Sequence, residues 1–95
     1  MGKFTAEATE EQKQAMVAAI LGMANDIAEI LSVSAGIDCK LDPERNSHFC
    51  ATVDFKDESG YKVYASHPAH VAVINGFIKP ILQPGSRAAS QFKLA

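Results

Sequence analysis

The sequence predicts an α+β domain whose elements run in the order strand, helix, strand, strand, helix, strand. Three observations support this prediction: a capped amphipathic helix begins near Thr9, two segments of alternating apolar residues follow between residues 31 and 55, and a second helix begins at Pro68. A chain of 95 residues has room for one domain, so we expect residues 1–95 to form a single domain.

The first predicted helix has both a start signal and an apolar face. Residues 9–12 read Thr-Glu-Glu-Gln, a capping box in which the Thr hydroxyl and the Gln side chain satisfy free backbone donors. Behind it, apolar residues recur at steps of four, three and four, which places them on one helical face: Met16, Ile20, Met23 and Ile27. We expect this face to pack in the core.

The apolar period then changes to two, which is typical of strands. In the first segment, one face carries Leu31, Val33 and Ala35. In the second segment, one face carries Phe49, Ala51, Val53 and Phe55. The polar residues 40–47 lie between the two segments and contain Asp-Pro, which is a turn signal. Together these segments predict an antiparallel hairpin.

Further helices and two terminal strands complete the predicted order. Residues 57–65 are acidic at their start and long enough for two helical turns. Another helix begins at Pro68 and continues until Pro80 interrupts it. We expect residues 3–8 to be the remnant of a first strand, and the alternating residues 87–94 to be the last strand. This succession is the ferredoxin-like arrangement.

Charge and apolar patterning exclude two classes of partner. Nine Lys and Arg against eleven Asp and Glu give a net charge of −2, without the basic surplus that a phosphate backbone attracts, so we expect no nucleic-acid partner. The longest apolar stretch, residues 15–31, is interrupted by polar residues including Asp26 and Glu29, so we expect no membrane span. The N-terminal residues lack the apolar core of a signal peptide, which predicts a cytoplasmic protein.

The two cysteines predict neither a disulfide framework nor a metal site. We expect Cys39 and Cys50 to be free thiols in a reducing compartment; a bridge would need their Cα atoms within about 7 Å, which the sequence leaves open. Their spacing corresponds to no zinc motif, and a metal held by His67 and His70 would need a third ligand that no spacing in the sequence supplies. We therefore expect no metal and no cofactor.

Residues 64–71, Tyr-Ala-Ser-His-Pro-Ala-His-Val, resemble the stress-responsive dimeric α/β-barrel (Dabb) family, and residues 73–82 are similar to the family's final helix. The resemblance covers nearly the whole chain. It implies a four-stranded antiparallel sheet with helices on one face. It also implies a homodimer in which two such sheets pack face to face to make the barrel.

The chain departs from the family pattern at two places. Relatives usually begin with a longer first strand than Met1–Phe4 can supply. Relatives also often carry a His at the position that is Phe49 here, and His48 lies one residue away from it. Because a shift of one residue places a strand side chain on the opposite face, we do not assign His48 to the site.

The resemblance leaves two functional hypotheses. In the first, the protein is a stress-associated homodimer that binds a small apolar or aromatic molecule, with His67 and Phe77 as ligand-binding residues. In the second, it is a cofactor-independent lyase, because a plant polyketide cyclase of the family carries a Tyr and a His that match Tyr64 and His70. His70 would then be the base, its neutral imidazole favoured in the first turn of the helix that Pro68 begins, and Tyr64 the hydrogen-bond donor to an enolate oxygen.

A purely structural role for the two histidines stays open beside these hypotheses. His67 and His70 would then cap the helix and fix the turn, with no chemistry. If the pair Tyr64 and His70 is a site, a bend must bring the two together, because they lie six residues apart across a proline. Pro68 favours such a bend, since the residue before a proline is disfavoured in the helical conformation.

Overall fold

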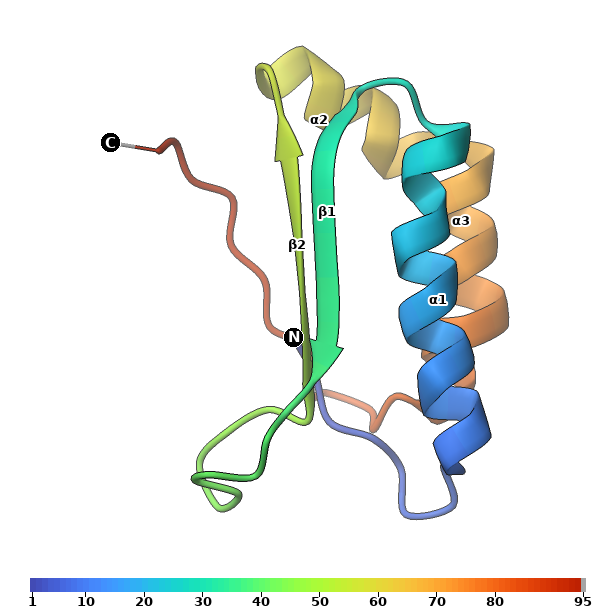
Figure 1. The fold of residues 1–95 in the computed structure, drawn as a ribbon, viewed down its shortest axis with the longest axis vertical. Helices are drawn as coiled ribbons and strands as arrows, with labels where there is room; N and C mark the ends of the chain where they lie inside the picture. The colour runs from blue at the N-terminus through green and yellow to red at the C-terminus, as the bar shows by residue number, and fades with distance from the viewer. Residues whose placement is uncertain (95) are drawn as a thin grey trace.

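The computed structural model describes residues 1–94. In chain order its elements are α1 (Glu10–Asp26), β1 (Ile30–Ile37), β2 (Phe49–Phe55), α2 (Glu58–Ser66), α3 (Pro68–Val73), the π-helical turn η1 (Ile74–Ile78) and the 3-10 turn η2 (Lys79–Ile81). The two strands form an antiparallel hairpin, α1 and α3 lie side by side along one of its faces, and α2 crosses one end (Figure 1). None of the helices within residues 1–94 has the length and apolarity needed to cross a bilayer.

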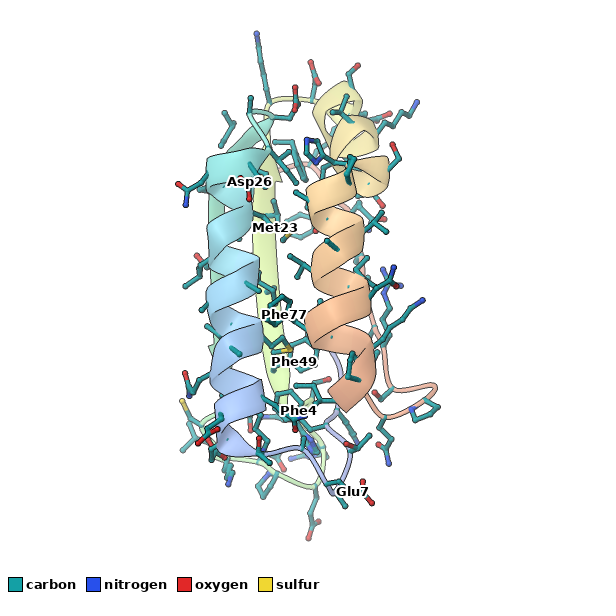
Figure 2. The ribbon with its side chains drawn as sticks, turned by 90° about the vertical axis from the view of Figure 1, so that its right-hand side faces the viewer. Phe4, Glu7, Met23, Asp26, Phe49 and Phe77 are labelled. Carbon is teal, nitrogen blue, oxygen red and sulfur yellow. The ribbon has the colours of Figure 1, made fainter. Side chains whose placement is uncertain are left out.

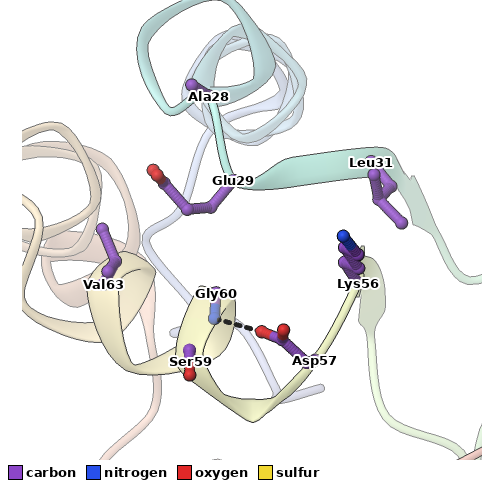
Figure 3. Close-up of a pocket in the computed structure, with 8 residues that line it drawn as sticks. All are labelled: Ala28, Glu29, Leu31, Lys56, Asp57, Ser59, Gly60 and Val63. Atoms are coloured by element: carbon purple, nitrogen blue, oxygen red, sulfur yellow. Dashed lines mark hydrogen bonds between the residues drawn. The ribbon is translucent and has the colours of Figure 1, made fainter.

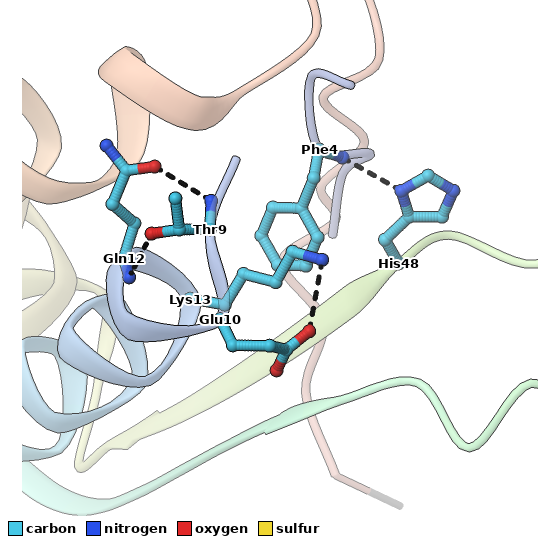
Figure 4. A network of polar contacts seen from close by, with 6 residues as sticks. All are labelled: Phe4, Thr9, Glu10, Gln12, Lys13 and His48. Carbon is cyan, nitrogen blue, oxygen red and sulfur yellow. Dashed lines mark hydrogen bonds and ion pairs between the residues drawn. The ribbon is translucent and has the colours of Figure 1, made fainter. Parts of the chain in front are cut away.

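The first helix forms as the sequence predicts. Thr9 Oγ1 accepts a hydrogen bond from the Gln12 backbone N–H (3.1 Å), and Gln12 Oε1 accepts one from the Thr9 N–H (2.9 Å), which completes the capping box (Figure 4). Such a cap stabilises a helix by about 1 kcal/mol. The predicted apolar face is buried, with every side chain at most 3% exposed: Met16, Ile20, Met23 and Ile27.

The hairpin has the predicted strands but one face assignment is wrong. Val33 pairs with Val53 and Ala35 pairs with Ala51, so the predicted apolar residues at these positions share the face toward the helices. A bulge between Ile30 and Ser32 interrupts the register. A bulge inserts one extra residue and reverses which side chains face inward. Ile30 is therefore buried in the core, whereas Leu31, predicted on the inner face, is 67% exposed.

No helix within residues 1–94 covers the other face of the hairpin (Figure 1). Its exposed residues are small or polar: Ser32, Ser34, Gly36, Cys50, Thr52 and Asp54. Ser32 Oγ donates a hydrogen bond to Asp54 Oδ2 across the two strands (2.5 Å). We call this surface the open face.

The two terminal strands are not formed as predicted, so the four-stranded sheet is not confirmed. Within residues 1–94 the sheet has two strands, and the terminal segments add isolated antiparallel bridges between Gly2 and Phe49 and between Phe4 and Leu82. The N-terminal segment meets β2 at the Gly2–Phe49 bridge and turns toward α1 after Thr5. Residues 87–94 form no strand.

His48 anchors the N-terminal segment, a role that the sequence does not reveal. Its Nδ1 accepts a hydrogen bond from the Phe4 backbone N–H (2.9 Å; Figure 4). The Phe4 ring stacks on Phe49 with 5.2 Å between centroids, and Lys13 Nζ lies 5.1 Å from the Phe4 centroid. His48 therefore holds the segment through its hydrogen bond, and its side chain is part of the scaffold.

The helix that begins at Pro68 changes type before Pro80. Its first turns are α-helical, then the Lys79 N–H bonds to the Ile74 carbonyl, five residues back, in the π-helical turn η1. Pro80 has no N–H, so it cannot continue the α-helical hydrogen bonds, and its ring displaces the backbone before it. The predicted interruption is therefore present, spread over η1 and η2.

Candidate functional site

The bend that a Tyr64–His70 site requires is present. Tyr64 lies in the last turn of α2 and His70 in the first turn of α3. His67 between them has φ −65° and ψ 135°, an extended conformation, and its N–H bonds to the Tyr64 carbonyl (3.1 Å). Pro68 disfavours the helical conformation for His67, so α2 ends there and α3 begins in a new direction.

The bend stacks the Tyr64 and His70 rings on each other. Their centroids are 4.0 Å apart and their planes meet at 29°. Tyr64 also contacts Phe55 (5.0 Å between centroids) and Tyr61 (6.2 Å). Phe55, Tyr61, Tyr64 and His70 form the aromatic cluster, which joins the end of β2 to α2 and α3.

Hydrogen bonds to Nδ1 distinguish His70 from the other two histidines. Nδ1 of His70 lies 3.1 Å from the Ala65 carbonyl oxygen, and because a carbonyl can only accept, this nitrogen carries the proton. Nε2 of a neutral His70 therefore holds a free lone pair. Nδ1 of His67 and of His48 instead accepts from a backbone N–H, so their basic nitrogens are already engaged.

The Tyr64 hydroxyl is a suitable hydrogen-bond donor for a ligand. Partial burial raises the pKa of Tyr64 above its ordinary value of 10.0, the neighbouring Tyr61 raises it further, and the charge of Arg87 lowers it. The phenol is therefore protonated at neutral pH. It makes no hydrogen bond with any of residues 1–94, so its donor is available.

The two residues predicted to bind ligand lie outside the aromatic cluster. His67 caps α3, since its Nδ1 accepts a hydrogen bond from the Ala69 N–H (3.0 Å). Phe77 is 42% exposed and lies between α1 and the helix that continues α3 (Figure 2). It lies seven positions after His70, which places it about 10 Å further along the helix axis. Of the four predicted site residues, the structure brings Tyr64 and His70 into contact, whereas His67 and Phe77 lie outside the cluster.

Two surface cavities are lined by neither Tyr64 nor His70. One, of about 370 Å³, lies beside α2 between the α1–β1 and β2–α2 connections, where Asp57 caps α2 by accepting from the Gly60 N–H (3.0 Å; Figure 3). The other, of about 490 Å³, lies at the far end of the hairpin and is lined by both Cys39 and Cys50. Both cysteines are free and exposed. Within residues 1–94, no three His, Cys, Asp or Glu side chains are grouped to hold a metal ion.

Three contributors to this site were missed in the sequence. Tyr61 and Tyr64 are three residues apart, a spacing that places both on one helix face and could have been recognised. Phe55 is identified in the sequence only as a residue of the apolar face of the second predicted strand. No local signal relates Arg87 to Tyr64, because the two are far apart in sequence.

Three solved structures are similar in fold to this chain. A dimeric ferredoxin-like protein of unknown function from Thermobifida fusca has a TM-score of 0.85 and 28% identity, over 99% of this chain and 85% of that one. A dimeric protein of unknown function and ferredoxin-like fold from Bacteroides fragilis has a TM-score of 0.68 and 21% identity, over 86% and 81%. An Arabidopsis thaliana protein has a TM-score of 0.75 and 15% identity, over 98% and 93%.

These structures support the ferredoxin-like α+β fold that the order of elements predicts. None of the curated proteins matches the sequence significantly. The family model of the stress-responsive A/B barrel domain matches residues 1–93. The chain, with its bent Tyr64–His70 connection and its helices on one face of the hairpin, therefore belongs to the stress-responsive A/B barrel (Dabb) domain family.

Proposed function

We propose that this protein is a homodimer that binds a small apolar or aromatic molecule at the Tyr64–His70 pair. The observation that carries the proposal is the stacking of these two rings. Within residues 1–94, neither the Tyr64 hydroxyl nor Nε2 of His70 makes a hydrogen bond. Tyr64 offers a hydroxyl donor and His70 an Nε2 acceptor beside apolar ring surface from Phe55. A ligand with an aromatic or apolar body and one hydroxyl or carbonyl oxygen fits this combination.

The dimer is supported by the open face and by the similar proteins described as dimeric. A two-stranded hairpin with helices on one side leaves its other face to water or to a partner. Two copies packed through their open faces would form a barrel. Sedimentation equilibrium at micromolar concentration should give twice the chain mass of 10.2 kDa. A well-behaved monomer would contradict this part of the proposal.

We place the protein in the cytoplasm. Cys39 and Cys50 are exposed free thiols, and a reducing compartment preserves such thiols. Both thiols also line the same cavity, so we would expect them to be oxidised in an oxidising compartment.

Binding can be mapped by NMR with 4-propylphenol as the probe. The proposal predicts amide shift changes centred on residues 64–70 of the full-length protein, and a roughly fivefold weaker affinity in Tyr64→Phe and His70→Ala, since one hydrogen bond is worth about 1 kcal/mol. Tyr61→Phe is the matched control, because it removes the neighbouring hydroxyl of the same cluster. Equal affinity in all four proteins, or shifts centred elsewhere, would contradict the site.

A second candidate function is that of a cofactor-independent, polyketide cyclase-like lyase, and the free Nε2 of His70 favours it. His70 Nε2 would take a proton from a carbon next to a carbonyl. The C–H electron pair would then move into an enolate, whose oxygen would accept a hydrogen bond from the Tyr64 hydroxyl. The enolate carbon could attack a second carbonyl of the same substrate, which is the ring-forming step of an aldol cyclisation.

The proton-transfer step can be measured without the natural substrate. The α-protons of 4-phenylbutan-2-one exchange with D₂O slowly, and NMR follows the exchange directly. If His70 is a base, the wild-type protein should accelerate exchange and His70→Ala should lose about 10²- to 10⁴-fold of that acceleration. If wild type and variant give the same rate while 4-propylphenol binding still depends on His70, the protein is a binding protein and no lyase.

A further inference from the structure

The cavity beside α2 is formed where four segments meet at one end of the hairpin. Its lining residues come from the α1–β1 connection, the start of β1, the β2–α2 connection and α2 (Figure 3). Its volume of about 370 Å³ is that of a site for a small molecule, since such sites enclose about 300 to 1,000 Å³. We call it the α2 cavity.

Two large apolar side chains are exposed in the α2 cavity. Leu31 is 67% exposed there because the bulge between Ile30 and Ser32 directs Ile30 into the core and Leu31 away from it. Val63 of α2 lines the same cavity and is 46% exposed. β-bulges are frequent beside functional sites, where they redirect a side chain. A ligand that covers Leu31 and Val63 would remove apolar surface from water, which is favourable.

Two opposite charges also line the α2 cavity, and they are not paired with each other. Glu29 contributes a carboxylate and Lys56 an ammonium group. The ion pairs found within residues 1–94 lie elsewhere, one in α1 and one in the loop before β2. Asp57, the third charged residue of the lining, accepts a hydrogen bond from the Gly60 N–H and caps α2. Glu29 and Lys56 are therefore available to a ligand.

Each side of the α2 cavity combines one of these charges with one apolar side chain. Glu29 and Val63 lie on one side, and Lys56 and Leu31 lie on the other (Figure 3). A complementary ligand has an ammonium group at one end, a carboxylate at the other and an apolar group beside each. A dipeptide of two apolar residues has this pattern, and its ends lie about 7 Å apart when it is extended. In a single amino acid both charges are attached to one carbon, so they cannot reach opposite sides.

We propose that the α2 cavity binds an apolar dipeptide with free ends, its ammonium group at Glu29 and its carboxylate at Lys56. Opposite charges on the two sides would fix the direction of the peptide, and Leu31 and Val63 would contact its side chains. Neither Tyr64 nor His70 lines the α2 cavity, so this site is separate from the proposed ligand site and its test is independent of that site.

NMR titration with leucyl-leucine at low ionic strength tests the site, because salt screens exposed charges. The inference predicts amide shift changes centred on residues 28–31 and 56–63. N-acetyl-leucyl-leucine lacks the ammonium group and leucyl-leucine amide lacks the carboxylate, so each should bind at least about fivefold more weakly. Free leucine, whose charges cannot span the cavity, should also bind at least about fivefold more weakly.

Variants assign each charge of the peptide to its partner. Glu29→Gln and Lys56→Met should each weaken leucyl-leucine binding at least about fivefold. Glu58→Gln and Lys62→Met are the matched controls, because these neighbouring charges do not line the cavity, and they should bind as wild type does. Glu29→Gln should not further weaken binding of the N-acetylated peptide, which has no ammonium group to lose.

Leu31→Ala tests the apolar contact, with Leu21→Ala on α1 as its control, since Leu21 is exposed and does not line the cavity. Only Leu31→Ala should weaken leucyl-leucine binding. If Leu31→Ala instead dissociates a dimer in sedimentation and leaves peptide affinity unchanged, Leu31 is an interface residue and the inference is overturned. Shift changes centred elsewhere, equal affinity for the capped peptides, or free leucine binding as tightly as the dipeptide would also overturn it.

Discussion

At the scale of single residues, the three histidines fall into two classes according to the hydrogen bond that Nδ1 makes. In His48 and His67, Nδ1 accepts a hydrogen bond from a backbone N–H and so fixes a chain segment. In His70, Nδ1 donates to the Ala65 carbonyl and leaves Nε2 free. Residue type and motif do not distinguish these roles, because the roles depend on which backbone group each ring meets.

His48→Ala should destabilise the protein without affecting the candidate site. The variant leaves the Phe4 N–H without its acceptor and releases the N-terminal segment from the hairpin, which should lower the free energy of unfolding by about 1 to 2 kcal/mol. Urea denaturation measures this loss. Asn46→Ala, in the nearby exposed loop, is the control and should change stability by less than about 0.5 kcal/mol. A loss of 4-propylphenol affinity in His48→Ala would contradict its assignment as a scaffold residue.

Tyr64 should make the protein less stable as pH rises through about 10. Its pKa is raised in the folded state, chiefly by burial, so the unfolded chain ionises first and the stability present below pH 10 is lost above it. Urea titrations at pH 8 and pH 11 should therefore show a larger fall for wild type than for Tyr64→Phe. Tyr61→Phe, which keeps the Tyr64 phenol, should retain most of that fall. An identical fall in wild type and Tyr64→Phe would contradict the burial of this hydroxyl.

At the scale of elements, local signals predict local structure. The capping box and apolar spacing of α1 depend on residues within the helix, and both are confirmed. The bulge at Leu31 and the conformation of residues 87–94 depend on pairing with distant segments. The predicted inward position of Leu31 and the predicted last strand are therefore not found in the structure. A period of two identifies a segment that can be a strand, but a strand also needs a neighbour with free backbone groups.

The bend between α2 and α3 should depend on the cap that His67 provides. His67→Ala removes the acceptor of the Ala69 N–H and should cost about 1 kcal/mol of stability, whereas His67→Asn, whose side-chain oxygen can cap a helix, should retain most of it. Thermal and urea denaturation compare the two variants. If His67→Asn binds 4-propylphenol as wild type does, His67 is a capping residue. A tenfold loss of affinity in a fully stable His67→Asn would instead make it a ligand-binding residue.

At the scale of the whole molecule, the core lies between one face of the hairpin and the helices α1 and α3. Ile27 is fully buried at the end of α1, next to the start of β1. Ile27→Ala should lower the free energy of unfolding by about 2 to 5 kcal/mol, because it leaves a cavity in this small core. Leu41→Ala is the size-matched control, since Leu41 is 90% exposed and should change little. Similar losses in both variants would contradict the described packing.

The candidate site could be predicted in part from the sequence. Tyr64, His70 and the bend at Pro68 follow from one continuous segment, so a motif identifies them. Phe55 comes from β2 and Arg87 from the C-terminal segment, so only the folded chain places them near Tyr64. His67 and Phe77 belong to the same continuous segment but do not join the site. His67 is engaged as the N-cap of α3, and Phe77 lies further along the helix.

Native mass spectrometry of the protein purified without denaturation tests the dimer and the Tyr64–His70 site together, because one spectrum reports both the dimer and its bound molecules. We expect a dimer of twice 10.2 kDa carrying a small apolar or aromatic molecule, and a dimer without that molecule when Tyr64→Phe and His70→Ala are combined. A monomer, or a dimer whose bound molecule is retained undiminished in the double variant, would contradict the assignment of Tyr64 and His70 as the binding site of a homodimer.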